Sequence, residues 1–336
     1  MGCPPNQRGG QPIQPAEDSV THDHDTASLG VPLTNLDEPL FDGAGATKRD
    51  LIAYLEGIAG RIIPELADRP LSVIRVHRGQ EAFMQKNLPS YTPAWVQRVT
   101  LWAGSSKRAV TYALCNDSRT LVWFGNQRAV EYHPALVRVD SPEHMTDLVL
   151  DIDPPSGESY PAAVRAARVV RDVLSDEGLA AVVKTSGAKG LHVLVPVDRS
   201  VSIDAAAAAT RAIASRAVQR DPATLTTAFV KDDRAGKVFV DSTRVGGATL
   251  VAAYSPRVRQ GAPVSFPLDW DELDDVRPAD FTVLTALRHL GDGDRWATRM
   301  PPAQRLAPGL VEEGKTIPVA RVQAMHEGKR RARAAR

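Results

Sequence analysis

Two aspartates separated by one residue are the first feature of this sequence that could do chemistry. They lie in Leu148-Val-Leu-Asp151-Ile-Asp153-Pro-Pro155, which alternates like a β-strand and therefore points Asp151 and Asp153 to the same face. Two carboxylates this close repel each other when both are ionised, unless a cation lies between them. The prolines end the strand, so we expect the pair at its carboxyl end, where a loop leaves room for a ligand. A strand that merely runs into an acidic turn has the same pattern.

A glycine-containing turn supplies a second group of polar residues, in Ser186-Gly-Ala-Lys-Gly-Leu-His192. Its glycines free backbone N–H groups, and Ser186, Lys189 and His192 could all face one anion, such as a triphosphate. The G-x-x-x-x-G-K-[ST] string of a P-loop is absent. The alternative is a glycine-rich hairpin with a solvated lysine.

A third carboxylate, Asp241, ends the apolar run Lys237-Val-Phe-Val-Asp241. Three carboxylates from two strands can hold two Mg²⁺ or Mn²⁺ ions ~3.5–4 Å apart. Arg234, Arg257 and Arg259 could clamp phosphates, although any one of them alone could be an ordinary surface arginine.

Alternating patterns predict the elements that must position these residues. Strands are expected at residues 71–76, 99–102, 109–114, 120–124, 130–134, 181–185, 191–197, 237–241 and 248–254. Helices are expected after Thr47, which is an N-cap with Asp50 at N3, over 160–175, and after Asp204 as a cap. Strands that alternate with helices indicate an α/β layer with a mixed sheet.

Composition is that of an ordinary soluble globular protein, with 43% hydrophobic and 24% charged residues among 336. No apolar run approaches the ~18 residues that span a bilayer, and no signal-peptide pattern opens the chain. The two cysteines, Cys3 and Cys115, fit a reducing cytosol better than a disulfide framework.

Charge is unevenly distributed although its formal sum is only +1. Residues 51–110 carry eight Lys and Arg against four acids, interleaved with Tyr91, Trp95 and Trp102. Such a segment could follow a phosphate backbone while aromatic rings stack on bases, or it could be a solvated face over core aromatics.

Both termini have the composition of disordered tails. We expect residues 1–30 to be disordered, and His22 and His24 to lie there without a frame that would make them metal ligands. Residues 301–336 are expected to form a flexible basic tail that contacts nucleic acid non-specifically.

Taken in order, the D-x-D pair, the S-G-x-K-G-x-H turn and the strand-ending aspartate resemble the archaeo-eukaryotic primase superfamily. The resemblance is closer to the polymerase domain of bacterial ligase D and covers about residues 33 to 290. Four further strings support it: Thr47-Lys-Arg-Asp-Leu-Ile-Ala-Tyr54, Phe83-Met-Gln-Lys86, Arg234-Ala-Gly-Lys-Val-Phe-Val-Asp241 and Tyr254-Ser-Pro-Arg257. It implies an α/β primase-polymerase domain over 31–300, with an N-terminal portion at 31–140 and a catalytic core at 141–260 built on an RRM-like mixed sheet with flanking helices.

The resemblance also implies roles for individual residues. Asp151, Asp153 and Asp241 would bind two Mn²⁺ or Mg²⁺ ions. Ser186, Lys189, His192, Arg257 and nearby Arg234 would hold the triphosphate, and His133 would lie near the ribose 2′-OH. Phe83 would stack at the template with Arg75 and Lys86 in the same pocket, and Lys48 would approach a downstream 5′-phosphate.

The sequence departs from the family pattern in four places, one of them three residues long. Met84 replaces a second phenylalanine, Ile74 replaces a lysine of the nucleotide pocket, and Ser242-Thr-Arg244 replaces Trp-Ser-Gln. Glu38 replaces a lysine that would pair with Lys48 on the 5′-phosphate, so we expect Glu38 to pair with Lys48 and weaken recognition of that phosphate. The K-x-D-G adenylation motif is absent, so a stand-alone polymerase is expected.

The expected function is therefore template-dependent nucleotidyl transfer that extends primers and fills short gaps during DNA repair, with a preference for ribonucleotides. Gapped or primer-template DNA and NTP or dNTP would be its substrates, a separate ligase or end-binding protein its partner, and the bacterial cytoplasm, at the nucleoid, its location. A two-metal nuclease and a non-catalytic module that binds DNA ends or gaps are the alternatives.

Overall fold

The computed structural model describes residue 1 and residues 27–103, 107–156, 159–245, 249–321 and 325. His22, His24 and the basic run at 329–336 lie outside this part, as does most of the expected N-terminal tail. Strands β1 (Ala27–Ser28) and β2 (Val31–Pro32) form a short antiparallel pair at the start of the described chain.

The N-terminal half is a five-stranded sheet covered by two helices. Its strands are β3 (Leu71–Arg75), β4 (Phe83–Gln85), β5 (Arg98–Ala103), β6 (Arg108–Ala113) and β7 (Ala129–Pro134), in the order β4-β3-β6-β5 with β7 paired to β3. Helix α1 (Lys48–Leu66) begins where the capping pattern predicts. Thr47 Oγ1 accepts from the backbone N–H of Asp50 at 3.2 Å, and Asp50 Oδ2 accepts from the Thr47 N–H at 2.7 Å.

The expected strand at 120–124 is wrong, because these residues lie in helix α2 (Ser118–Asn126). Asp117 caps the helix by accepting from the Thr120 N–H at 2.7 Å. Gly125 lets α2 approach α1 closely, since a Cβ there would lie 2.7 Å from Leu55 Cδ1. Tertiary packing therefore overrides the β propensity of this β-branched and aromatic run.

The C-terminal half is a six-stranded mixed sheet in the order β11-β12-β8-β10-β9-β13. Its strands are β8 (Asp147–Asp153), β9 (Val182–Thr185), β10 (Leu191–Pro196), β11 (Leu225–Thr226), β12 (Val238–Asp241) and β13 (Pro267–Leu268). Helices α3 (Tyr160–Asp176) and α4 (Ile203–Arg220) pack on each other and on this sheet. Ser202 caps α4 by accepting from the Ala205 N–H at 3.2 Å, so the expected cap, Asp204, lies inside the first turn instead.

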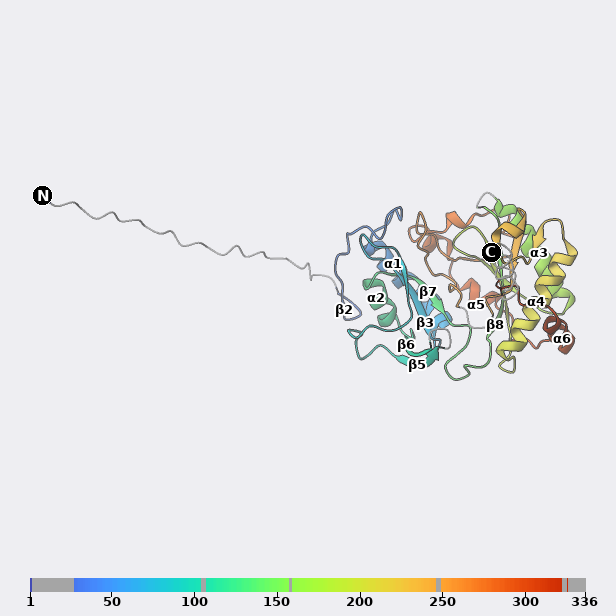
Figure 1. Cartoon of the computed structure of the whole chain (residues 1–336). Helices are drawn as coiled ribbons and strands as arrows, with labels where there is room; N and C mark the ends of the chain where they lie inside the picture. The colour runs from blue at the N-terminus through green and yellow to red at the C-terminus, as the bar shows by residue number, and fades with distance from the viewer. Residues whose placement is uncertain (2–26, 104–106, 157–158, 246–248, 322–324, 326–336) are drawn as a thin grey trace.

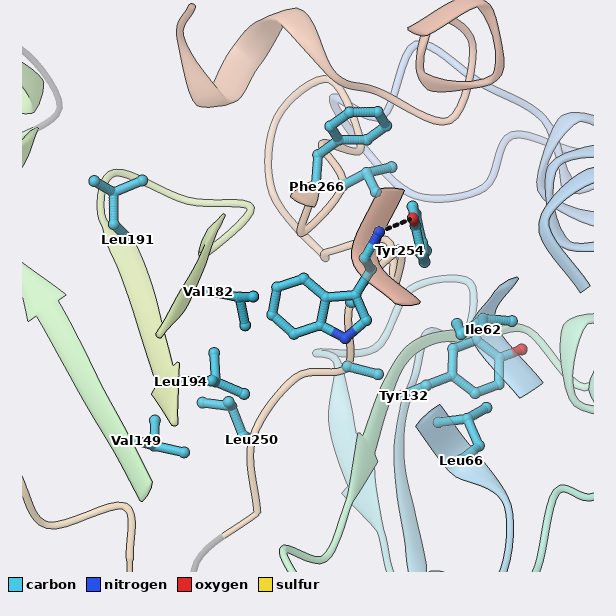
Figure 2. Close-up of a cluster of buried hydrophobic side chains, with 14 of the residues drawn as sticks. Ile62, Leu66, Tyr132, Val149, Val182, Leu191, Leu194, Leu250, Tyr254 and Phe266 are labelled. Atoms are coloured by element: carbon cyan, nitrogen blue, oxygen red, sulfur yellow. Dashed lines mark hydrogen bonds between the residues drawn. The ribbon is translucent and has the colours of Figure 1, made fainter. Parts of the chain in front are cut away.

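The two sheets lie next to each other, with α1 and α2 on one outer side and α3 and α4 on the other (Figure 1). One continuous apolar core joins the halves. Figure 2 shows Ile62 and Leu66 from α1 and Tyr132 from β7 in the same cluster as Val182 and Leu194 from the larger sheet. The position of each half is therefore set by buried side chains of the other.

Two expectations near the C-terminus are also wrong. Among residues 249–254, only Thr249 makes a bridge, to Ala135, and no strand forms. Helix α5 (Arg295–Arg299) is short, and α6 (Pro308–Thr316) lies inside the expected flexible tail. Helix α6 packs on α4, where Gly314 is needed because a Cβ would lie 1.8 Å from Ala208 O. The expectation of a flexible tail that starts at residue 301 is therefore wrong for the described residues up to Thr316.

The α/β class with a mixed sheet is confirmed. Short 3₁₀ turns complete the described elements, at Lys231–Arg234, Pro278–Asp280 and Ala286–His289. Within the described residues, no helix is both long and apolar enough to cross a membrane.

Candidate active site

The strands on either side of β8 place further polar residues beside its aspartates. Asp241 of β12 lies opposite Asp151, and His192 of β10 lies opposite Asp151 on the other side. Directly opposed residues of antiparallel strands point to the same face, so Asp241, Asp151 and His192 form a row across three strands. Asp153 lies two residues along from Asp151 at the end of β8. Backbone pairing therefore brings all three carboxylates to one end of the sheet.

Backbone proximity explains the glycines of the turn between β9 and β10. Gly187 has a φ of +65°, and a Cβ there would lie 2.5 Å from Arg257 Cγ. At Gly190, a Cβ would lie 2.0 Å from the carbonyl oxygen of Ile152 in β8. Ser186 Oγ accepts from two backbone N–H groups of the turn, each at 3.2 Å. The turn is therefore pressed between the D-x-D strand and the Arg257 segment.

Arg244 lies against two of the carboxylates. Its Nη2 is 2.9 Å from Asp151 Oδ2, and its Nε is 3.5 Å from Asp241 Oδ2. Burial raises the pKa of Asp151, and the charges of Asp241 and Asp153 raise it further, while the guanidinium of Arg244 acts in the opposite direction. Arg244 thus supplies the positive charge that the row of carboxylates requires.

Asp153 has two cations of its own. Lys189 Nζ lies 3.1 Å from Oδ1, and Arg234 Nη1 lies 3.0 Å from Oδ2. Lys189 also donates to the carbonyl of Pro154 at 2.5 Å, and the Arg234 guanidinium lies over the ring of Phe239 at 3.9 Å. Both cations are therefore held at the end of β8.

The donor set is of the right kind for a hard divalent ion, because carboxylate oxygens are the ligands that Mg²⁺ and Mn²⁺ prefer. No three His, Cys, Asp or Glu side chains in the described part of the chain are already gathered around one metal-sized point. The carboxylate oxygens of Asp151 and Asp153 face Arg244, Lys189 and Arg234 instead. The three aspartates fit a metal in chemistry and in strand position, and Arg244 would have to withdraw for an ion to enter.

Glu131, which was not expected at the site from the sequence, contacts residues of two segments there, β7 and the segment around Arg257. Its Oε2 lies 2.8 Å from His133 Nε2 and 3.0 Å from Arg257 Nε, and its Oε1 accepts from the Val258 N–H at 2.8 Å. Burial opposes ionisation of Glu131, but the bond to His133 and the charge of Arg257 outweigh it and lower its pKa to about 2. Arg257 Nη1 also donates to the carbonyl of Ser186. Burial lowers the pKa of His133, which favours its neutral form.

The residues expected at the template lie together on the smaller sheet. Phe83 is opposite Arg75 in the β3–β4 pairing and stacks on His77, with ring centroids 5.3 Å apart. Arg75 is buried and donates to the Tyr91 hydroxyl at 2.9 Å. Phe83 is 39% exposed, and Lys86, which directly follows β4, is exposed as well. An aromatic ring, two basic groups and an open face therefore occur together at this edge.

Lys48 is separate from both groups. Its side chain is buried at the start of α1, where Nζ donates to the Thr34 carbonyl at 2.5 Å. Burial and the nearby charge of Arg128 lower its pKa to about 8. Glu38 Oε2 lies 3.2 Å from Arg128 Nη1, so the predicted ion pair between Glu38 and Lys48 is wrong. The sequence could not show this because Arg128 is 90 positions away.

A cleft of about 720 Å³ runs past Glu38 and Arg128. His77, the stacking partner of Phe83, lines it, and so does Val258, which follows Arg257 in the chain. The cleft therefore lies next to both groups, through His77 on one side and Val258 on the other.

The structure brings nine of the expected site residues to one region. These are His133, Asp151, Asp153, Ser186, Lys189, His192, Arg234, Asp241 and Arg257. Phe83, Arg75 and Lys86 form a second group, and Lys48 a third. Besides Glu131, Lys184 and Arg244 lie at this site without having been expected there from the sequence. The signal for Glu131 was available, because it lies two residues before His133 and therefore on the same strand face.

A protein-family model, described as the primase-polymerase domain of LigD, matches residues 47–296. The chain is 37% identical over 291 residues to the multifunctional non-homologous end joining DNA repair protein LigD of Mycobacterium tuberculosis, covering 82% of this chain and 38% of that protein. It is 32% identical over 259 residues to the bifunctional non-homologous end joining protein LigD of Bacillus subtilis, covering 76% and 41%. The chain thus spans about two fifths of the length of these relatives.

One solved structure resembles this fold over nearly the whole length of the solved chain. It is the polymerase domain from Mycobacterium tuberculosis ligase D in complex with DNA, with a TM-score of 0.74 and 36% identity. The match covers 82% of this chain and 99% of that one.

Proposed function

Because this chain belongs to the LigD primase-polymerase domain family, whose members are DNA-directed nucleotidyltransferases, we propose that it extends primers and fills short gaps in DNA under the direction of a template. The observation that carries the proposal is the row of Asp241, Asp151 and His192 across three paired strands, with a Ser-Lys turn at its end. Relatives named for non-homologous end joining support a role in that repair pathway.

Asp151, Asp153 and Asp241 are the residues that would hold two divalent ions, Mn²⁺ or Mg²⁺. Ions bound there would make the primer 3′-hydroxyl more acidic and offset the charge of the phosphates. The aspartates supply oxygen ligands from a rigid sheet, which keeps their spacing fixed. Arg244 would have to leave the carboxylates for ions to bind there, and its charge would then be available to the bound nucleotide.

The triphosphate would lie along the turn between β9 and β10. Lys189 and Arg234 contribute positive charge from one side and Arg257 from the other. Ser186 holds the turn in shape, since its hydroxyl accepts from two N–H groups of the same turn. His192 would donate from the buried end of the row. These groups place an anion without reorganising the backbone.

The surroundings of His133 support a preference for ribonucleotides. The ionised Glu131 accepts from Nε2–H, and burial keeps the ring neutral, so Nδ1 is left as an acceptor. A ribose 2′-OH can donate to such a nitrogen, whereas a deoxyribose leaves it unpaired. Ribonucleotides should therefore be used at least as well as deoxyribonucleotides.

The template would cross the smaller sheet. Phe83 would stack on a template base, while Arg75 and Lys86 would contact the same strand. Lys48 would approach a downstream 5′-phosphate only if its side chain leaves Thr34, because that bond now buries the ammonium.

The central test is extension of a primer on a short-gapped duplex, comparing NTPs with dNTPs in Mn²⁺ and in Mg²⁺. We expect template-directed addition in both ions and at least equal use of NTPs. Strong selection for dNTPs would contradict the assignment of His133.

Asp151→Ala, Asp153→Ala and Asp241→Ala should each abolish extension and leave the thermal midpoint close to that of the wild type. Asp147→Ala is a matched control, because Asp147 lies at the other end of β8 and pairs with Arg69 at 3.7 Å. Near wild-type extension by any of the three variants would defeat the site assignment.

The same assay separates the two alternatives. A two-metal nuclease has no need of the Ser186, Lys189 and His192 cradle, and it would shorten the primer without NTP. A non-catalytic module that binds DNA ends would show no synthesis in the wild type. A separate ligase or end-binding protein in the bacterial cytoplasm would complete the repair.

A further inference from the structure

The row of polar residues continues onto a fourth strand. Lys184 of β9 lies opposite His192 in the β9–β10 pairing, so Asp241, Asp151, His192 and Lys184 stand side by side across the larger sheet. Lys184 is only 1% exposed. We propose that Lys184 is a positioning residue that holds His192 as an Nε2–H donor facing the nucleotide site. This inference rests on the proposed function for the role of His192 toward the triphosphate.

Three groups surround the buried ammonium. Lys184 Nζ lies 2.8 Å from His192 Nδ1, 3.0 Å from the Val251 carbonyl oxygen and 2.6 Å from Ser265 Oγ. The Ser265 hydroxyl donates its own proton to the Thr185 carbonyl at 2.7 Å, so it can only accept from Lys184. The Val251 carbonyl can also only accept. Two N–H groups of Lys184 are therefore committed, and the third points to His192 Nδ1.

An Nδ1 that accepts leaves the ring proton on Nε2. Because His192 Nδ1 lies 2.8 Å from the Lys184 ammonium and accepts from it, Nδ1 cannot itself carry a proton, so the ring has a single proton. His192 Nε2 lies 3.5 Å from Asp151 Oδ1. An N–H is complementary to that carboxylate and to a phosphate, whereas a bare nitrogen would repel both.

The opposite arrangement is an uncharged amine that accepts from Nδ1–H. Burial lowers the pKa of Lys184 and favours this form, while the charge of Asp151 and the position of its carboxylate beside His192 Nε2 favour the ammonium, with the ring proton on Nε2. The amine form would turn the lone pair of Nε2 toward Asp151 and the triphosphate. The two arrangements therefore predict opposite tautomers of His192.

A purely structural role is the other alternative. Lys184 could serve only to fasten the segments that contain Val251 and Ser265 to β9. Removing Ser265 Oγ should then have the same effect as removing the ammonium, and neither change should alter the tautomer of His192.

The test measures the tautomer of His192 by two-bond ¹H–¹⁵N correlation in protein labelled at histidine nitrogen, with His192→Gln to assign its signals. Wild-type protein should show an acceptor Nδ1 and a protonated Nε2. Lys184→Met keeps an unbranched side chain of similar length but has no N–H, so a substantial Nδ1–H population should appear. In the same variant, affinity for an NTP with Mn²⁺ should fall about 10-fold, as for loss of one charge-assisted bond, while affinity for the gapped duplex should not change.

Ser265→Ala is the matched control, since it removes another side-chain partner of the same ammonium. It should keep the wild-type tautomer and NTP affinity within about 2-fold. Equal losses of NTP affinity in both variants, or an unchanged tautomer in Lys184→Met, would overturn the inference. A wild-type His192 protonated at Nδ1 would overturn it without any variant, so the test survives even if Lys184→Met does not fold.

The outcome is separable from that of the proposed function. A wild-type protein that extends primers but shows the Nδ1–H tautomer contradicts only the role of Lys184. A wild-type protein that fails to extend any primer contradicts the proposed function, whatever the tautomer of His192.

Discussion

Each aspartate of the D-x-D pair already has a cation of this chain beside it. Arg244 contacts Asp151, while Lys189 and Arg234 contact Asp153. Clustered carboxylates repel one another, so these cations stabilise the fold when no divalent ion is bound. The same contacts mean that a metal must compete with a guanidinium for its ligands.

Arg244→Gln should therefore bind Mn²⁺ more tightly in the absence of DNA and nucleotide. Arg244 is partly exposed, so we expect a gain of roughly 3- to 10-fold rather than the large effect of a fully buried pair. Electron paramagnetic resonance of free Mn²⁺ during titration gives the affinity directly. Arg220→Gln, which removes an exposed pair with Asp176, is the control and should leave it unchanged. Weaker Mn²⁺ binding by Arg244→Gln would show that Arg244 does not compete.

Glu131 makes the stability of the protein sensitive to acid. Its native pKa of about 2 lies below the value of 4.5 expected for an unfolded chain, so the unfolded state binds the proton more readily. The stabilisation is fully present above pH 4.5 and is lost as the pH falls toward 2. The shift corresponds to an upper value of about 3 kcal/mol in the free energy of unfolding.

Glu131→Gln should remove this dependence. The slope of unfolding free energy against pH between about 4.5 and 2 should be shallower than in the wild type, as measured by urea midpoints. Glu312→Gln on α6 removes the same charge at an exposed ion pair with Lys315 and serves as the control. Parallel slopes for wild type and Glu131→Gln would contradict this role of Glu131.

At the scale of elements, the site depends on how closely the β9–β10 turn approaches its neighbours. Gly187 combines a positive φ with a backbone that lies against Arg257, and Gly190 lies against β8. At Gly187 the positive φ is a conformational requirement, and the nearby Arg257 side chain is a steric one. A glycine that has only the positive φ can separate the two effects.

Gly187→Ala should destabilise the protein by more than Gly236→Ala. Both glycines have a positive φ, +65° and +75°, and this alone costs about 1–2 kcal/mol for a residue with a Cβ. Only at Gly187 would the Cβ meet a neighbour, Arg257 Cγ at 2.5 Å, while at Gly236 nothing lies within 4 Å. Urea unfolding should show the difference, and NTP affinity should fall only in Gly187→Ala. Equal effects of the two substitutions would mean that the turn can move away from Arg257.

At the scale of the whole molecule, the cleft lies between the segment around Glu38, the connection from β3 to β4, and Val258. Glu38 lines this cleft and pairs with Arg128, which also donates to the carbonyl of Pro39 at 2.6 Å. A carboxylate here repels a phosphate dianion and occupies a guanidinium that could otherwise bind one. Lys48 is meanwhile held by Thr34.

We therefore expect weak recognition of a downstream 5′-phosphate by the wild type. Glu38→Lys should increase affinity for a short-gapped duplex that carries the 5′-phosphate, by roughly 5- to 10-fold at low salt, and should change little for the duplex without it. Fluorescence anisotropy with the four combinations of protein and DNA measures this. Asp37→Lys is a control for added charge, because Asp37 is exposed nearby and pairs with Arg49. A strong phosphate dependence in the wild type that Glu38→Lys leaves unchanged would show that another group takes this role.

Local patterns in the sequence were sufficient to predict the elements that hold the chemistry. The alternation around Asp151 and the prolines after Asp153 predicted strand β8 and its end, and Thr47 with Asp50 predicted the start of α1. These signals depend on neighbours within four residues, so the chain carries them without its fold. The residue types were equally informative, since carboxylates, a lysine and a histidine at these spacings already indicated metal and phosphate chemistry.

Only the tertiary structure decided which distant groups meet. The row from Asp241 to Lys184 depends on the register of four strands, and register is set by packing across the whole sheet. The sequence predicted a Glu38–Lys48 pair and a strand at residues 120–124, and both predictions were wrong for the same reason. The pairing of Glu38 with Arg128 and the helix at 120–124 depend on packing against segments far away in sequence. The chemical type of each site residue can therefore be read from the local sequence. Its charge, its partner and the direction in which it points are consequences of long-range contacts.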